Sequence, residues 1–423
     1  MNFDRKGFAK TTEKSALTLQ PKLHAHLVSE LVDALQSIFF AGEFADKIIK
    51  RKFKMHRQWG SRDRRFYAES VYEITRWWRQ LWYAIDTTPN RELVPLAVGA
   101  FLVRQGFELP SWDGFQGLDP EMIQQRLAKL PGRALKESIP DWLDQLGDQE
   151  LGARWPSILT SLNESSTVYL RTNTLKIQRQ ELMKKLRQEE VETLPVMGSE
   201  IALSLPVRKN VFSTKAFQDG FFEMQDLSSQ KIAPMLRVQP GQRVVDACAG
   251  AGGKTLHLAA LMKNQGRILS LDVAEWKLEE LQQRARRDGV DIVETRFIDT
   301  TKVIKRQHEN FDRVLLDVPC SGLGVLRRNP DKKWKLTAEE LENLKKLQQD
   351  ILRSYSKMAK VGGLVLYATC SILPSENEQQ IEKFMKDFGH QWRLLEQLRI
   401  DPDQGQGDGF YAALLERVVG EGA

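Results

Sequence analysis

The fold is decided by residues 242–273, QRVVDACAGAGGKTLHLAALMKNQGRILSLDV. An apolar, β-branched run ends at Asp246, a glycine-rich turn follows, and a helical apolar pattern leads to a second apolar run that ends at Asp272. Short apolar runs that alternate with helices indicate a mostly parallel sheet with helices on its faces. Glycines between a strand and a helix let the backbone approach a ligand at the helix N-terminus. We therefore expect a doubly wound α/β domain with a ligand site at this turn.

The same alternation continues toward the C-terminus, and the final apolar segments are expected to add an antiparallel strand pair. The resulting α/β domain should cover residues 236–423. Its further expected elements are strands within 292–299, 311–318 and 362–369, helices within 275–289 and 338–359, and the terminal strands within 392–400 and 409–419.

Two different regions precede this domain. Residues 1–150 are predicted to be all-helical, and residues 160–235 are predicted to form a small α+β extension. In the helical region the bulky aromatic side chains are interpreted as helix core rather than as a binding surface. The expected helices lie within 23–42, 62–85 and 91–107, and the core aromatics are Trp77, Trp78, Trp82 and Tyr83.

Composition limits the class of protein. The chain has 423 residues, a net charge of +6 and a sequence pI near 9.0, which fits a nucleic-acid partner without requiring one. Three cysteines and no CxxC pair argue against a disulfide framework and a structural zinc site, so we assign no metal ligands. The N-terminus carries no apolar signal segment, and no run of about 18 apolar residues is present. We expect a cytoplasmic, monomeric protein without a membrane segment.

The glycine-rich turn predicts a nucleoside-containing cofactor. Its GKT sequence suggests a phosphate loop, but Cys248 stands where that loop needs its first glycine. Asp272 lies 19 residues after Gly253, where a carboxylate can bind ribose hydroxyls, and Asp299 could reach an adenine amino group. These features fit a nicotinamide dinucleotide or S-adenosylmethionine, and Asp246 favours the latter because it can bind an amino group. A helix N-cap role for Asp272 is the structural alternative.

Two further strands each end in a cysteine, in FDRVLLDVPCSG (311–322) and GGLVLYATCS (362–371). If the strands are neighbours, Cys320 and Cys370 face one pocket at the carboxyl edge of the sheet. A thiolate that adds to cytosine C6 makes C5 able to accept a methyl group, and this chemistry needs help with proton transfer and release. Asp317 is placed for cytosine N3, and the Lys254 cation could lower a thiol pKa. Burial as small apolar residues is the alternative for both cysteines, and a solvated position is the alternative for Lys254.

These motifs resemble the Sun family of RNA cytosine-5 methyltransferases, which includes bacterial small-subunit ribosomal RNA enzymes and the Nop2/Sun-type enzymes of eukaryotes. The resemblance covers about residues 165–417 and one departure stands out, since Gly250-Ala251 replaces the usual Ala-Pro. The motifs that carry it are DACAGAGGKT (246–255), LDVPCSG (316–322), RRNPDKKW (327–334), YATCSILPSENEQQI (367–381) and GDGFYAALLE (407–416), with FFEMQDLSSQ (221–230) leading into the first strand.

The resemblance implies that Cys370 is the nucleophile, that Cys320 assists release, and that the fold is a Rossmann-like methyltransferase domain. In position and helicity, the N-terminal region resembles the NusB-like RNA-binding domain of the bacterial enzyme. The catalytic candidates are Cys370, Cys320, Asp317 and Lys254. The S-adenosylmethionine candidates are Asp246, Cys248, Ala249, Gly250, Gly252, Gly253, Lys254, Asp272, Lys277, Asp299 and Asp317.

RNA is the expected partner, and three basic stretches are candidate contacts: 51–65, Arg171 with its neighbours, and 327–335. The last follows the PCSG turn, so we expect it at the pocket rim, holding phosphates around an extruded cytosine. The named RNA-binding candidates are Arg171, Arg327, Arg328, Lys332, Lys333 and Trp334. Ribosomal RNA is the leading substrate, transfer RNA is the nearest alternative, and a catalytically silent ribosome-assembly factor is a third reading. The Thr-Cys-Ser motif disfavours a DNA methyltransferase.

Overall fold

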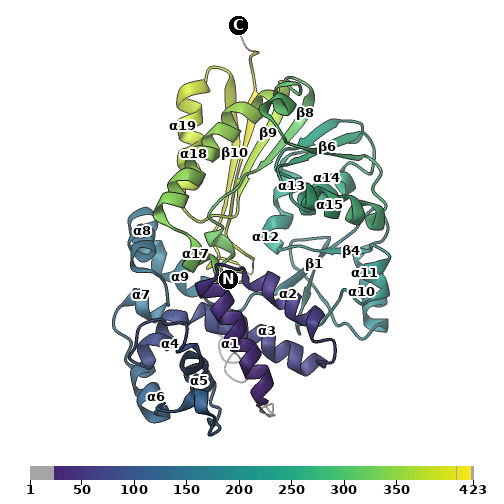
Figure 1. Ribbon diagram of the computed structural model, residues 1–423. Coiled ribbons are helices and arrows are strands. Elements are labelled where there is room, and N and C mark those ends of the chain that lie inside the picture. The colour runs from purple at the N-terminus through teal and green to yellow at the C-terminus, as the bar shows by residue number, and fades with distance from the viewer. Residues whose placement is uncertain (1–22, 406, 421–423) are drawn as a thin grey trace, which may run out of the picture. The chain divides into compact units, whose positions relative to one another are not determined.

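The computed structural model describes residues 23–405 and 407–420, which divide by compactness after Ser138 into two units. The first unit is all-helical, and the second combines helices with two β-sheets (Figure 1). The helices α8 (Asp141–Leu151) and α9 (Trp155–Leu162) belong to the second unit. The division into three domains at about 150 and 235 stays a prediction.

The helical unit contains more, shorter helices than its sequence pattern predicts. The expected helix within 62–85 is interrupted at Trp77, where the backbone leaves the helical region. The short basic helix α2 was not predicted. The helices described in this unit are α1 (Ala25–Phe40), α2 (Ala45–Met55), α3 (Ser61–Arg76), α4 (Trp78–Ala84), α5 (Val94–Arg104), α6 (Pro120–Ala128) and α7 (Arg133–Lys136).

The aromatic residues of this unit are partly in its core. Trp78 and Trp82 are buried, as predicted, and the Phe39 ring stacks on Trp78 with centroids 3.7 Å apart. Tyr83 is 37% exposed, so its assignment to the core was wrong. Trp77 is half-buried beneath the Arg104 guanidinium, 4.2 Å from the ring centroid.

The second unit begins with a small antiparallel sheet of order β2-β3-β1-β4. One apolar cluster joins the sheet to the helices that pack on it. The sheet's elements are β1 (Val168–Thr172), α10 (Arg179–Gln188), β2 (Leu194–Pro195), β3 (Ala202–Leu205), α11 (Lys215–Gln218) and β4 (Phe222–Met224). The expected strand, helix and strand of this α+β region are all present.

The large sheet has the order β10-β11-β9-β8-β5-β6-β7, and β11 runs antiparallel to both of its neighbours. It is the expected Rossmann-like, doubly wound methyltransferase sheet with a terminal antiparallel pair. Its strands are β5 (Arg243–Asp246), β6 (Arg267–Asp272), β7 (Val293–Phe297), β8 (Phe311–Asp317), β9 (Ala359–Thr369), β10 (Trp392–Ile400) and β11 (Phe410–Arg417).

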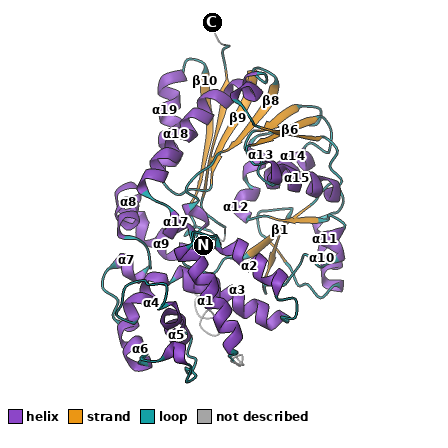
Figure 2. Cartoon of the chain, in the orientation of Figure 1, coloured by secondary structure: helices purple, strands orange, loops and turns teal. Residues whose placement is uncertain are grey.

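Helices cover both faces of this sheet (Figure 2). Because side chains alternate along a strand, Val244 faces one helical layer and Val245 the other. The first layer contains α13 (Ile232–Met235), α14 (Gly253–Leu261) and α15 (Glu275–Asp288), and the second contains α16 (Thr301–Lys305), α18 (Ala338–Tyr355) and α19 (Glu378–Phe388). The remaining helices of the unit include α12 (Leu227–Gln230) and α17 (Lys332–Lys335).

The strand order reverses between β5 and β8. The chain runs outward from β5 through β6 to β7 and then returns to place β8 on the other side of β5. Open α/β sheets bind ligands at the carboxyl ends of strands at such a reversal. The predicted ligand edge is therefore formed by the residues that follow β5, β6, β8 and β9.

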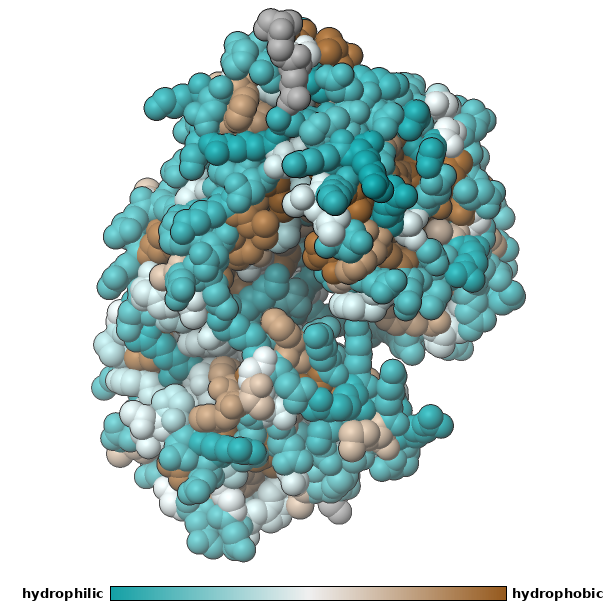
Figure 3. Space-filling view, turned by 45° about the horizontal axis from the view of Figure 1, so that its top comes forward, coloured by the Kyte–Doolittle hydropathy of each residue, from teal (hydrophilic) through white to brown (hydrophobic). Residues whose placement is uncertain are grey.

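Hydrophilic side chains cover most of the face drawn in Figure 3. Within residues 23–405 and 407–420, no helix is both long and apolar enough to cross a membrane.

Candidate functional site

The glycine-rich turn between β5 and α14 exposes its backbone to the carboxyl edge. Gly250 and Gly252 have φ values of +54° and +86°, which side chains with a Cβ rarely adopt. A Cβ at Gly252 would also lie 2.0 Å from Leu281 Cδ1 of α15. Gly250 stands where the family usually has alanine, and its positive φ is one that alanine rarely adopts.

Two carboxylates line this turn, one at the end of β5 and one at the end of β6. Asp246 is buried, and its Oδ2 accepts a hydrogen bond from Thr255 Oγ1 at 2.7 Å. Its Oδ1 is buried and has no hydrogen-bond partner among the described residues. Burial raises the pKa of Asp246 to about 7, against the hydrogen bond from Thr255, which lowers it. This carboxylate has one oxygen in place for a further donor.

Asp272 shapes the turn rather than capping a helix. Its Oδ2 accepts the Gly250 N–H at 2.8 Å and its Oδ1 accepts the Ala274 N–H at 2.8 Å. The N-cap of α15 is Ala274, so the alternative role of Asp272 as an N-cap does not hold. Each oxygen keeps a second lone pair that a ribose hydroxyl could use.

The remaining cofactor candidates lie around these two carboxylates. Ala249 donates its N–H to Leu271 O at 2.9 Å, and the Cys248 thiol has a raised pKa because of burial and the neighbouring Asp246 charge. Lys277 is half-buried beside Trp276, with Nζ 5.8 Å from the ring centroid. Asp299 is exposed beyond the end of β7.

Lys254 and Asp317 form an ion pair across the edge. Lys254 Nζ, from the first turn of α14, lies 2.7 Å from Asp317 Oδ2 at the end of β8. The Lys254 side chain is only 11% exposed, so the solvated position considered for it does not hold. Burial lowers the pKa of Lys254, but the Asp317 charge and hydrogen bond outweigh burial and raise it.

The two cysteines of the predicted pocket are in contact. Asp317 of β8 is in register with Ala368 of β9, so the two parallel strands end side by side. Cys320 Sγ and Cys370 Sγ lie 3.3 Å apart, and both thiols are free. The strands are therefore neighbours, which is the condition for the expected shared position of the two thiols, and both thiols lie at the carboxyl edge of the sheet.

The surroundings drive the two thiol pKa values in opposite directions. The hydrogen bond from Cys320 lowers the pKa of the Cys370 thiol; burial opposes this, while the Lys332 and Lys254 cations add to it. For Cys320, the same hydrogen bond and burial hold the pKa well above its ordinary value. Cys370 is therefore the thiol that more readily becomes a thiolate, and Lys332 contributes more to this than Lys254, the cation that sequence reasoning chose.

Sequence reasoning missed the group that holds the two cysteine loops together. The Glu376 carboxylate is fully buried and accepts hydrogen bonds from both serines that follow the cysteines, Ser321 and Ser371. Gln348 Nε2 donates to the same carboxylate at 2.9 Å. Glu376 lies within the segment YATCSILPSENEQQI, but nothing in the pattern itself links it to the other loop.

Three of the cations expected to contact RNA are buried instead: Arg171 of the α+β region, and Arg327 and Lys333 of the expected pocket rim. Arg171, Arg327 and Lys333 are each less than 7% exposed, and each donates a hydrogen bond to protein atoms. Arg171 donates to Gly253 O at 2.6 Å, which ties the small sheet to the glycine-rich turn. Arg327 binds Ser161 O, Gly407 O and Pro402 O. These side chains brace loops instead of forming an open cationic surface.

The other candidates of this stretch remain partly exposed. Arg328 is held between Asp226 and Asp408, with ion-pair distances of 2.5 and 2.9 Å. Lys332 lies against Gly322, so closely that a Cβ there would overlap its ammonium group. Trp334 is half-buried next to Lys333, whose Nζ lies 5.3 Å from the ring centroid.

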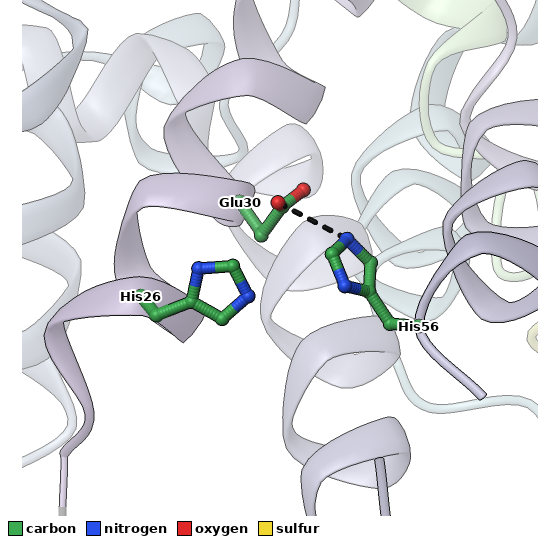
Figure 4. Close-up of side chains that lie close together, drawn as sticks. All are labelled: His26, Glu30 and His56. Atoms are coloured by element: carbon green, nitrogen blue, oxygen red, sulfur yellow. Dashed lines mark ion pairs between the residues drawn. The ribbon is translucent and has the colours of Figure 1, made fainter. Parts of the chain in front are cut away.

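Among the described residues, one cluster of metal-ligating side chains was found, and it lies in the helical unit. Figure 4 shows His26, Glu30 and His56, with His56 Nε2 3.1 Å from Glu30 Oε1. Glu30 also pairs with Lys52, and the His56 ring stacks on Trp59 with centroids 4.4 Å apart. Because a lysine already neutralises the carboxylate, we interpret the cluster as an ion-pair and aromatic contact.

The comparisons with known proteins agree with the geometry of the large sheet. The family model described as 16S rRNA methyltransferase RsmB/F matches residues 233–416, and the model of the RsmF/B-like ferredoxin-like domain matches residues 139–211. The chain is 31% identical over 418 residues to the probable ribosomal RNA small subunit methyltransferase B of Synechocystis, covering 90% of this chain and 93% of that protein.

Solved structures are similar as well. The crystal structure of PH0851 is 26% identical, with a TM-score of 0.79, and the match covers 93% of this chain and 99% of that one. A methyltransferase homolog protein from Pyrococcus horikoshii is 28% identical, with a TM-score of 0.58, covering 71% of this chain and 100% of that one. The sequence motifs, the sheet and these matches agree: the chain belongs to the RsmB/F family of 16S ribosomal RNA methyltransferases.

Proposed function

We propose that this protein transfers a methyl group from S-adenosylmethionine to C5 of a cytosine in ribosomal RNA, through a covalent bond between Cys370 and cytosine C6. The observation that carries the proposal is the contact of two free thiols at the carboxyl edge of the sheet, with opposite pKa directions. A reaction that first needs a nucleophile and later needs a proton acceptor has a use for both thiols.

The carboxylates at the glycine-rich turn fit S-adenosylmethionine. The unpartnered Asp246 Oδ1 suits the ammonium group of the amino-acid part, and the free lone pairs of Asp272 suit the ribose hydroxyls. Asp299 and Lys277 are proposed to contact the adenosine end. When bound, the cofactor supplies an electrophilic methyl group, and the protein must do the rest.

Cys370 and the Lys254–Asp317 pair activate the base. The Cys370 thiolate adds to cytosine C6, which shifts electron density to C5 and toward N3. The ion pair offers a donor and an acceptor to the N3 and N4 edge of cytosine, so it can stabilise the adduct without a net change in its own charge. C5 then accepts the methyl group.

Cys320 completes the reaction. The Cys370 thiolate holds the proton on Cys320, and this effect ends when the sulfur becomes bound to carbon. Cys320 can then lose its proton to solvent and accept the C5 proton as a thiolate. The C5–C6 double bond re-forms as the Cys370 sulfur leaves as a thiolate. The net products are 5-methylcytosine, demethylated cofactor and one proton.

Methyl transfer from radiolabelled S-adenosylmethionine tests the proposal. Purified protein is incubated with 16S ribosomal RNA, with small ribosomal subunits or with bulk transfer RNA, and the RNA is digested to nucleosides. We expect labelled 5-methylcytidine from a ribosomal substrate. Label found only in transfer RNA would make transfer RNA the substrate instead of ribosomal RNA. Label in a nucleoside other than 5-methylcytidine would overturn the cytosine-5 chemistry.

A further inference from the structure

We propose that Glu376 is a positioning residue for the two-thiol site: its one buried carboxylate holds the Cys320 loop and the Cys370 loop against each other and so orients the two thiols. The inference rests on the proposed function, because it concerns the same two cysteines. It adds a residue that contacts neither the base nor the cofactor in that proposal.

Four donors meet at this carboxylate. Glu376 Oε1 accepts the Ser321 N–H at 2.8 Å and Gln348 Nε2–H at 2.9 Å. Its Oε2 accepts the Ser321 hydroxyl at 2.5 Å and the Ser371 hydroxyl. Gln348 Nε2 also donates to Pro319 O, directly before Cys320. The carboxylate is thus bonded to both loops and to α18 at once, which fixes their spacing.

Each serine repeats the same local arrangement in its own loop. Ser321 Oγ accepts the Leu323 N–H at 3.3 Å, and Ser371 Oγ accepts the Leu373 N–H at 3.1 Å. Each serine hydroxyl thus accepts a hydrogen bond from the N–H two residues later and donates its own proton to Glu376. These two bonds together fix the orientation of the loop. The preceding cysteine is therefore held in place by a hydroxyl whose proton points to the same acceptor in both loops.

The backbones of the two loops also touch. Gly324 N–H donates to Cys370 O at 2.9 Å, and a Cβ at Gly324 would lie 2.7 Å from that oxygen. This close approach needs both loops in register, and Glu376 is the side chain that bridges them. Loss of the carboxylate would leave two serine hydroxyls and one backbone N–H without their buried acceptor.

The charge of Glu376 acts on the two thiols unequally. It helps to raise the pKa of Cys320, after the stronger effects of the Cys370 hydrogen bond and burial. The charged groups that face the thiols are Lys332 of α17 for both, Lys254 of α14 and Asp317 of β8 for Cys370, and Glu376 for Cys320. Glu376 therefore favours the state in which Cys320 keeps its proton and donates it toward Cys370.

The test is the reactivity of each thiol toward iodoacetamide as a function of pH, with the modified cysteine identified by peptide mass spectrometry. Thiolates react and thiols do not, so the rate at each cysteine follows its ionisation. In the wild-type protein we expect Cys370 to react about tenfold or more faster than Cys320 at pH 7, which corresponds to at least one pKa unit. In Glu376→Gln the ratio should fall toward one.

Two further variants keep the outcome clear. Ser321→Ala/Ser371→Ala keeps the buried carboxylate with its other two donors, and we expect an intermediate ratio even if Glu376→Gln folds poorly. Glu382→Gln makes the same chemical change at an exposed position of α19 and should leave the ratio unchanged. S-adenosylmethionine affinity, measured by calorimetry, should be the same in all folded variants.

The outcomes separate this inference from the proposed function. A wild-type ratio near one would overturn the assignment of Cys370 as nucleophile, and with it the basis of the proposed function. A high wild-type ratio that persists in Glu376→Gln and in the double serine variant would overturn the role of Glu376 alone. Loss of stability without a change in the ratio would make Glu376 a residue of the core only.

Discussion

The Cys320 loop and the Cys370 loop have nearly the same local structure and opposite chemistry. Each places a serine directly after the cysteine and a leucine two residues later, and each serine donates to Glu376. Yet the pKa of Cys370 is lowered and that of Cys320 is raised. The largest cause of the difference is the hydrogen bond between the two thiols, which raises the pKa of Cys320 and lowers that of Cys370, and the charged groups that face each thiol contribute less.

The two loops also differ in how they leave the sheet. Cys370 follows β9 directly, whereas Val318 and Pro319 separate Cys320 from the end of β8. Cys370 is therefore the thiol anchored to the rigid strand, close to Lys254 and Asp317. Preorganised geometry matters most for the atom that forms the covalent bond, which agrees with the roles proposed for the two cysteines.

Removal of the nucleophile, Cys370, should have the largest effect on methyl transfer. We expect Cys370→Ser to lower methyl transfer by about a thousandfold or more, because a serine hydroxyl is scarcely ionised at neutral pH. S-adenosylmethionine should still bind. The measurement is radiolabelled methyl transfer under single-turnover conditions, and activity within tenfold of wild type would exclude Cys370 as the nucleophile.

Removal of the second thiol should stop the reaction at a later stage. In Cys320→Ala the bond to C6 forms, but loss of the C5 proton has no acceptor, so turnover should fall about a hundredfold. A protein–RNA adduct should then accumulate on denaturing gels and disappear in Cys320→Ala/Cys370→Ala. If Cys370→Ala alone traps RNA instead, the two roles are exchanged.

A substitution of Lys332 tests how much its charge lowers the pKa of Cys370. Its cation lowers the pKa of Cys370, so Lys332→Met should move the pH profile of Cys370 alkylation to higher pH. A shift of one unit slows alkylation at pH 7 about tenfold. Lys346→Met, at an exposed position of α18, is the matched control. An unchanged profile in Lys332→Met would assign the lowered pKa of Cys370 to the Cys320 hydrogen bond and the Lys254 cation.

The affinity for S-adenosylmethionine should depend on pH through Asp246, and a substitution of Asp246 should leave the relative reactivity of the two thiols unchanged. Asp246 has a pKa raised to about 7 by burial, so it is mostly protonated below that pH and must release its proton to bind an ammonium group. Cofactor affinity should therefore fall about tenfold for each unit of pH below about 7 and level off above it. Asp246→Asn should bind more weakly at pH 8 and lose this dependence, with the ratio of thiol reactivities unchanged. Calorimetry at several pH values measures the affinity for S-adenosylmethionine. A pH-independent affinity of the wild-type protein would argue against contact of Asp246 with the ammonium group.

Much of the large sheet could be predicted because its apolar runs end at the functional residues. Asp246, Asp272, Asp317 and Cys370 stand at strand ends or directly after them, and a parallel sheet brings such ends to one edge. The helical unit was harder. The basic helix α2 is short and has no capping side chain at Phe44, and its buried residues Ala45, Ile48 and Ile49 lie on one face among basic residues.

The sequence does not tell which of its basic side chains are exposed and which are buried. Arg171 and Arg327 appear as surface cations in the sequence, but they are buried and bind backbone carbonyls from distant segments. Arg57, by contrast, lies in a basic stretch of the helical unit and is exposed. Charge density along the chain is the same kind of signal in both cases, and only tertiary packing decides between them. Glu376 was missed for the same reason.

The division of work between the two thiols is tested most directly by trapping the covalent bond and finding its position. RNA that carries 5-fluorocytidine at the target keeps its bond to the enzyme, because C5 has no proton to lose after methyl transfer. The trapped complex is digested with protease and nuclease, and the modified peptide is sequenced by mass spectrometry. We expect a cytosine nucleotide on Cys370 of the peptide that contains YATCS. A nucleotide on Cys320, or no adduct with a ribosomal substrate that the enzyme methylates, would contradict it.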